Sequence, residues 1–157
     1  MKKRIILTAL ALLLLAGALS GCGEKKEQQI NLREFFDAVS EKYALAGMTE
    51  LEGEVLEAFY PGLAALDTVQ RVAYAPMISA SVSEYVFLQC ADQATAKKAE
   101  AILRQRISDQ ANGGAWYPES MAAWSRARVV TKGNYVLLIA SDGLEDQIEA
   151  DFAALWK

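Results

Sequence analysis

Glu84 is the residue whose place in the sequence most demands a chemical explanation. It lies in the segment Val82–Ala91, where alternation puts Glu84 on the same side as Val86 and Leu88, a side expected to face the core. A carboxylate in an apolar core must be paired with a cation or protonated. Pairing would make Glu84 a structural clamp, whereas protonation would suit acid–base chemistry, so the sequence leaves both interpretations open.

Two arginines late in the next predicted helix, Arg104 and Arg106, are the candidate partners of Glu84. Arg106 follows Ile102 by four residues and Leu103 by three, so it lies beside the apolar stripe of that helix. We therefore predict that Glu84 pairs with Arg106 or with Arg104 and joins a strand to a helix. The alternatives are that Glu84 faces a ligand, or that it is catalytic and the protein is a hydrolase.

A second group of candidate residues is aromatic. Trp116, Tyr117 and Trp124 follow the glycine-containing sequence Asn112–Gly114. Aromatic side chains of this kind can stack on sugar rings, which makes these three a candidate contact surface for a glycan. The simpler interpretation is a lid packed over the sheet edge, because large aromatic side chains mostly serve burial.

The sequence offers little other equipment for catalysis. It contains no histidine, and its two cysteines are Cys22 and Cys90. Cys90 lies in an apolar strand pattern, where a free cysteine behaves as a small buried hydrophobe. The sequence has no visible metal-ligand cluster, nucleotide-binding glycine loop or nucleophile–base pair. We therefore expect a protein that is not an enzyme and that uses no cofactor.

Cys22 ends a segment that has the three parts of a secretion signal. Basic residues precede an apolar run, Ile5–Ala18, and small residues follow it. The run is shorter than the ~18 residues that a membrane-spanning helix needs. Its ending, Leu19-Ser20-Gly21-Cys22, resembles the lipobox of bacterial lipoproteins. The resemblance implies a diacylglycerol on the Cys22 sulfur and cleavage just before this residue.

The expected organisation is a signal peptide over residues 1–21, a lipidated cysteine with a polar tether over 22–30, and one domain over 31–157. The whole chain carries 16 Lys and Arg against 20 Asp and Glu. Removal of the three basic residues of the signal leaves a formal charge of about −7. This charge argues against a nucleic-acid partner and against a domain lying flat on an anionic bilayer.

The periodicity of the domain predicts alternating helices and strands. Predicted helices begin at the cap residues Asn31, Thr49, Asp92 and Asp142. Predicted strands cover residues 69–75, 82–91, 128–132 and 135–140. The second part of this order contains two ββα units, which bury their apolar faces by pairing. We therefore predict an α+β fold in which two ββα units form a four-stranded antiparallel sheet. Helices pack on this sheet, and one or two N-terminal helices precede it.

Several short motifs together resemble a family of small bacterial lipoproteins known only as a domain of unknown function (domain of unknown function 4358). The motifs are Glu84 in the sequence Ser-Glu-Tyr-Val, Arg104 with Arg106, Tyr117-Pro118, and Gly133-Asn134-Tyr135-Val136. The resemblance extends roughly from Phe35 to Phe152. Because the family occurs mainly in clostridial-type Gram-positive bacteria, it implies the outer face of the cytoplasmic membrane. It implies no catalytic residues.

These observations favour a membrane-anchored extracytoplasmic lipoprotein whose domain is a non-enzymatic interaction module for an envelope protein. The first alternative is a module that binds a small ligand or glycan, which requires an open pocket containing Glu84 or the Trp116 loop. The second alternative is an envelope hydrolase that uses Glu84, although no second acid or base is placed near it in the sequence. The chain is too short for a two-lobed transport receptor.

Overall fold

The computed structural model describes residues 29–78 and 80–156. Within these residues, five strands form one antiparallel sheet and five α-helices pack around it. In sheet order the strands are β1 (Met48–Glu50), β2 (Thr68–Pro76), β3 (Glu84–Cys90), β5 (Tyr135–Ala140) and β4 (Arg128–Lys132). The two hairpins β2–β3 and β4–β5 meet where β3 pairs with β5 at the centre of the sheet.

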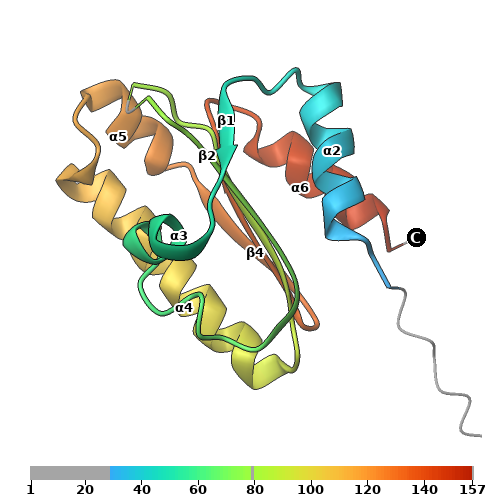
Figure 1. The fold of residues 1–157 in the computed structure, drawn as a ribbon. Coiled ribbons are helices and arrows are strands. Elements are labelled where there is room, and N and C mark those ends of the chain that lie inside the picture. The colour runs from blue at the N-terminus through green and yellow to red at the C-terminus, as the bar shows by residue number, and fades with distance from the viewer. Residues whose placement is uncertain (1–28, 79, 157) are drawn as a thin grey trace, which may run out of the picture.

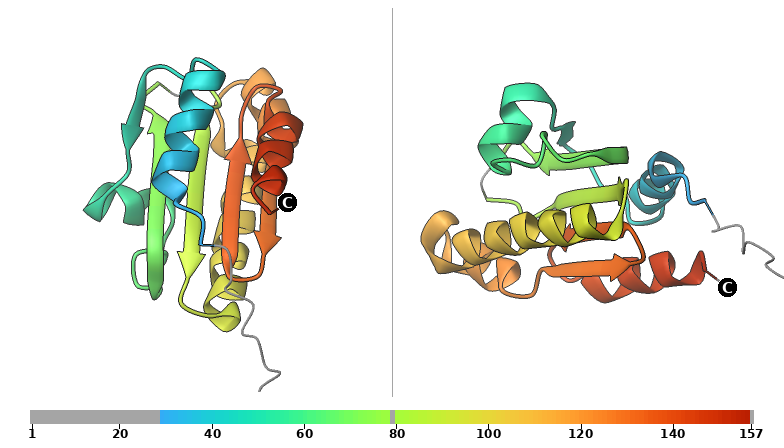
Figure 2. Two further views of the ribbon diagram at one scale, coloured as in Figure 1. Left: turned by 90° about the vertical axis from the view of Figure 1, so that its right-hand side faces the viewer. Right: turned by 90° about the horizontal axis from the view of Figure 1, so that it is seen from below.

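Helices cover both faces of the sheet, as Figures 1 and 2 show. One face carries α2 (Leu32–Lys42) and α6 (Glu145–Ala154). The other face carries α3 (Gly53–Phe59), α4 (Gln93–Asp109) and α5 (Pro118–Trp124). A wide turn, η2 (Gln110–Gly114), follows α4 directly. The helices that close the two ββα units, α4 and α6, therefore lie on opposite faces.

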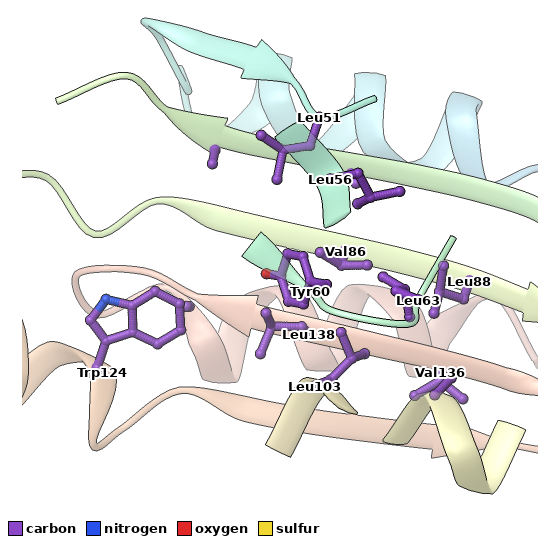
Figure 3. Close-up of a cluster of buried hydrophobic side chains, with 14 of the residues drawn as sticks. Leu51, Leu56, Tyr60, Leu63, Val86, Leu88, Leu103, Trp124, Val136 and Leu138 are labelled. Atoms are coloured by element: carbon purple, nitrogen blue, oxygen red, sulfur yellow. The ribbon is translucent and has the colours of Figure 1, made fainter. Parts of the chain in front are cut away.

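The central strand β3 is buried on both sides, because each face of the sheet has its own core. Tyr85 and Phe87 pack with the residues under α2 and α6. Val86 and Leu88 point the other way, into the core under α3, α4 and α5 that Figure 3 shows. Glu84 has the parity of Val86, so its carboxylate enters this second core.

The predicted α+β class with an antiparallel sheet is confirmed, but the sheet has five strands instead of four. The extra strand is β1, at a place where Thr49 was expected to cap a helix. Thr49 instead pairs with Ala75 of β2, and Leu51 donates a backbone hydrogen bond to Ala73 at 2.8 Å. The edge of β2 that does not face β3 supplies hydrogen-bond partners for these backbone groups of β1. The prediction of a helix start at Thr49 is therefore wrong, and α3 begins at Gly53.

Two of the other helix starts are as predicted and one is not. The Asn31 side chain caps α2, and the Asp92 side chain caps α4. Asp142, however, does not cap α6. The N-cap residue of α6 is Leu144, without a side-chain cap, and its backbone N–H donates to the side-chain oxygen of Ser141 at 3.0 Å.

The expected signal peptide, Cys22 and most of the expected tether lie outside the described residues. Among the helices over residues 29–78 and 80–156, none combines the length and apolar composition needed to cross a bilayer. Ile30, predicted as the last residue of the tether, packs against the domain: its side chain is buried and its backbone N–H donates to the Tyr135 hydroxyl at 3.2 Å.

Candidate functional site

Glu84 is held by three hydrogen bonds at a buried position. It is the first residue of β3 and is 3% exposed. Arg106 binds it through two N–H groups, with Nε 3.0 Å from Oε1 and Nη2 3.0 Å from Oε2. The hydroxyl of Tyr60 donates the third hydrogen bond, to Oε1. Of the two candidate partners, Arg106 therefore occupies the site, whereas Arg104 pairs with Glu100 on the exposed side of α4.

The lengths of β3 and α4 explain why Arg106 reaches Glu84. From Glu84, β3 runs to Cys90, a distance of about 20 Å at the usual rise of a strand. The Asp92 cap then starts α4, which returns along the same face of the sheet. Arg106 lies 14 residues after Asp92, about 21 Å along a helix. The last turn of α4 therefore arrives beside the first residue of β3.

The environment fixes the charge state of both donors. Burial raises the pKa of the Tyr60 hydroxyl well above its ordinary value, and the negative charge of Glu84 raises it further. Burial by itself would lower the pKa of the Arg106 guanidinium. The hydrogen bonds and charge of Glu84 outweigh this effect and leave that pKa above its ordinary value. At neutral pH a cationic Arg106 and a neutral Tyr60 therefore donate to Glu84.

Three aromatic rings surround the Arg106 guanidinium. Its central carbon lies 4.7 Å from the ring centroid of Phe59, 5.7 Å from that of Tyr60 and 5.5 Å from that of Trp124. At these distances the cation interacts favourably with the electron-rich ring faces. The rings also limit exposure of the Arg106 side chain to 17%. Glu84 and the aromatic rings together therefore hold the guanidinium in one position.

A hollow of about 240 Å³ opens above the ion pair, and we call it the Arg106 hollow. Glu84 and Arg106 form its floor. Its polar wall consists of Ser81 and Ser83, which precede β3, and of Gln110 in η2. The hollow therefore lies between the β2–β3 connection and the end of α4.

The rim of the Arg106 hollow is apolar and strongly exposed. Met77 and Ile78, directly after β2, contribute one side of it, and Trp116, directly after η2, contributes another. Trp116 is 85% exposed, the largest value among the exposed large hydrophobic residues of the described chain. Exposed apolar side chains that gather around a concave surface are typical of binding sites.

The three aromatic residues predicted as one contact surface come together only in part, because Trp116 and Trp124 line the Arg106 hollow and Tyr117 does not. Trp124 is 5% exposed and lies in the core of Figure 3 with Tyr60. It lines the Arg106 hollow and lies over the guanidinium, but it offers little exposed surface to a partner. Tyr117 is half-exposed and lies outside the hollow. The lid interpretation is wrong for Trp116, since its neighbour Ala115 is buried while the indole faces solvent.

Two parts of the site were missed by the sequence analysis. Tyr60 was not among the candidate residues, yet it donates to Glu84. A tyrosine directly after an apolar helix face was the signal, because a buried hydroxyl requires a partner. Met77 and Ile78 lie in a connection without periodicity, and nothing in the sequence places them beside Trp116.

Other reactive groups of the described chain lie apart from this site. Cys90 is fully buried, and burial raises the pKa of its thiol, with Asp92 adding to the effect. Among the described residues, no group of three or more potential metal-ligating side chains comes together. The hollow is therefore the feature of the described residues that brings candidate binding residues together.

Comparison with known proteins gives the family. A family model described as Domain of unknown function (DUF4358) matches residues 41–141. The chain belongs to this family. The DUF4358 match covers all five strands and the Arg106 hollow, whereas Cys22 precedes it. No curated protein and no solved structure matched the chain.

Breaking the ion pair should destabilise the domain strongly. Glu84→Gln leaves Arg106 largely buried without a countercharge, and we expect the free energy of unfolding to fall by about 3 kcal/mol. The double variant Glu84→Gln/Arg106→Gln should lose about 2 kcal/mol less than the sum of the single variants. Arg104→Gln, the matched surface control, should change it by less than about 0.5 kcal/mol. Denaturant unfolding measures all four, and additive losses would contradict the pair.

The buried Tyr60 hydroxyl should make the domain sensitive to alkali. Its pKa in the folded state lies well above the value of about 10 expected in the unfolded state. Its contribution to stability is therefore complete below about pH 10 and is lost as the pH rises beyond it. Tyr60→Phe should flatten the decline in unfolding free energy between about pH 9 and 11. Tyr117→Phe should keep the wild-type slope, and equal slopes for all three proteins would refute this role.

Proposed function

We propose that this protein is a membrane-anchored extracytoplasmic lipoprotein whose domain is a non-enzymatic binding module. The Arg106 hollow is its binding surface. The observation that carries the proposal is the combination of a fixed polar floor, Glu84 with Arg106, and an exposed apolar rim of Met77, Ile78 and Trp116. Such a rim is costly to expose to water unless it meets a partner.

The anchoring part of the proposal is supported by the sequence before the domain. The lipobox-like ending at Cys22 is followed by the polar residues Gly23–Gln29, and the buried Ile30 starts the domain. Seven residues span at most roughly 25 Å when extended. A diacyl anchor would therefore hold the domain close to the membrane surface, since two acyl chains are sufficient for stable attachment.

The position of the hollow also fits an anchored binding module. The chain enters the domain beside Tyr135, at the start of β5. Glu84 pairs with Ala140, at the end of the same strand. Five residues of strand separate Tyr135 from Ala140, which is about 17 Å. The hollow therefore lies toward the end of the sheet opposite the point where Ile30 enters the domain.

A binding role accounts for the state of Glu84 better than catalysis does. Both of its oxygens are occupied, one by Tyr60 and Arg106 and the other by Arg106 alone. A carboxylate whose two oxygens are both engaged in this way is a hindered nucleophile. Among the described residues that line the hollow, Glu84 is the only carboxylic acid, whereas glycoside hydrolysis generally uses two.

Photo-cross-linking in cells tests anchoring and binding together. A photoreactive side chain at Met77, on the rim, should capture an envelope component. The same group at Val69, an exposed position near the other end of β2, should not. In the Met77 background, Ser81→Trp should abolish the adduct, because the indole would fill the hollow from its exposed wall.

Cys22→Ser should release the protein into the soluble fraction or leave an uncleaved precursor, and should abolish the adduct. Cys90→Ala, the matched control, should stay in the membrane fraction. Two outcomes would overturn the proposal. Membrane-bound, normally processed Cys22→Ser protein would refute the anchor. Equal labelling from Met77 and Val69, or an adduct unaffected by Ser81→Trp, would refute the binding surface.

A further inference from the structure

The floor of the Arg106 hollow offers hydrogen-bond donors that the protein itself does not use. A guanidinium carries five N–H groups, of which two donate to Glu84. The Tyr60 hydroxyl also lies within hydrogen-bonding reach of the guanidinium, so at least two of the five N–H groups remain. Since Arg106 lines the hollow and is partly exposed, these donors are available to a ligand's oxygen atoms.

The charge of the hollow selects against ionic ligands. Glu84 and Arg106 are the only ionisable residues among the described residues that line it, and they neutralise each other. A bound anion would add an uncompensated negative charge to a site where Arg106 is already paired, which is costly in a partly dehydrated space. The acidic domain would also repel it. The ligand should therefore be neutral and rich in oxygen acceptors.

The walls and rim specify the shape of that ligand. Ser81, Ser83 and Gln110 can each donate and accept hydrogen bonds. Trp116 presents a flat apolar surface that is almost fully exposed. A pyranose ring is complementary to both surfaces. Its apolar C–H face matches the Trp116 indole, and the neutral hydroxyl groups on its edge match the polar wall. The volume of about 240 Å³ lies below the range typical of sites for drug-sized ligands and suits one ring.

We infer that the Arg106 hollow binds one neutral pyranose unit of a glycan, with its C–H face on Trp116 and its hydroxyl oxygens on Arg106. Gln110, Ser81 and Ser83 complete the polar contacts. This assignment rests on the proposed function, because it names the ligand of the same binding surface. A domain anchored through Cys22 would present this hollow on the extracytoplasmic side of the membrane, where glycan is available.

Tryptophan fluorescence of the full, lipidated protein in a detergent without a sugar headgroup tests this inference. The probes are neutral oligosaccharides that together present glucose, galactose, mannose and N-acetylhexosamine pyranoses. At least one should give a saturable change in emission. Trp116→Ala should weaken binding at least tenfold, measured by calorimetry with the same sugar, whereas Tyr117→Ala should leave it unchanged. Gln110→Ala should weaken it without altering the fold, as checked by circular dichroism.

The outcomes separate this inference from the proposed function. Binding of a neutral sugar that depends on Trp116 supports both. Failure of every sugar in the set, while the Met77 cross-linker still captures a protein, would overturn the glycan assignment and leave the binding surface in place. Preference for a sulfated or phosphorylated oligosaccharide over its neutral counterpart would also overturn it. If neither sugars nor the cross-linker report binding, both proposals fail.

Discussion

A carboxylate inside the core must be paired with a cation and hydrogen-bonded, and the surrounding structure supplies these partners. Glu84 begins the central strand and points into the core under α3, α4 and α5, where it is 3% exposed and poorly solvated. Its charge is compensated by Arg106 from the last turn of α4, and its oxygens are further satisfied by Tyr60 from the end of α3. Trp124, the last residue of α5, then covers the guanidinium. The contacts of the buried Glu84 thus fix the positions of β3, α3, α4 and α5 relative to one another.

This arrangement also explains why a polar hollow exists in an otherwise apolar layer. A leucine in place of Arg106 would let the neighbouring segments close over it. The guanidinium has more N–H groups than Glu84 can accept, so complete burial would leave donors unsatisfied. The site therefore stays partly open above Arg106. The exposed side chains of Met77, Ile78 and Trp116 surround the opening. The binding surface therefore exists because the protein does not satisfy all the hydrogen-bond donors of Arg106.

Sequence periodicity predicted the parts of this site that are governed by strand and helix geometry. Alternation in β3 placed Glu84 toward the core, and the ββα order brought the end of α4 back to it. The choice between Arg104 and Arg106 was left open, because both lie in the same turn and only packing decides which one turns inward. The strand β1 was missed because three residues give no usable alternation, and the Thr49 cap pattern competed with it.

The rim could not be predicted for a different reason. Met77 and Ile78 belong to a connection whose path depends on what β2 and β3 contact, so no local pattern locates them. The aromatic residues after η2 were grouped by their closeness in sequence. The helix α5, about two turns long, separates them, with Trp124 buried and Trp116 in solvent. Which residues share a surface depends on the tertiary fold, so residue type alone does not predict it.

The central claim is that Arg106 is immobilised by Glu84, and nitrogen-detected NMR of the arginine side chains tests it most directly. The Arg106 Nε–H, assigned by its loss in Arg106→Lys, should exchange with solvent much more slowly than the Nε–H of the exposed Arg104. Rotation about its Nε–Cζ bond should also be slow. If Arg106 instead exchanges and rotates as fast as Arg104, the buried pair does not organise the site, and this account of the hollow is wrong.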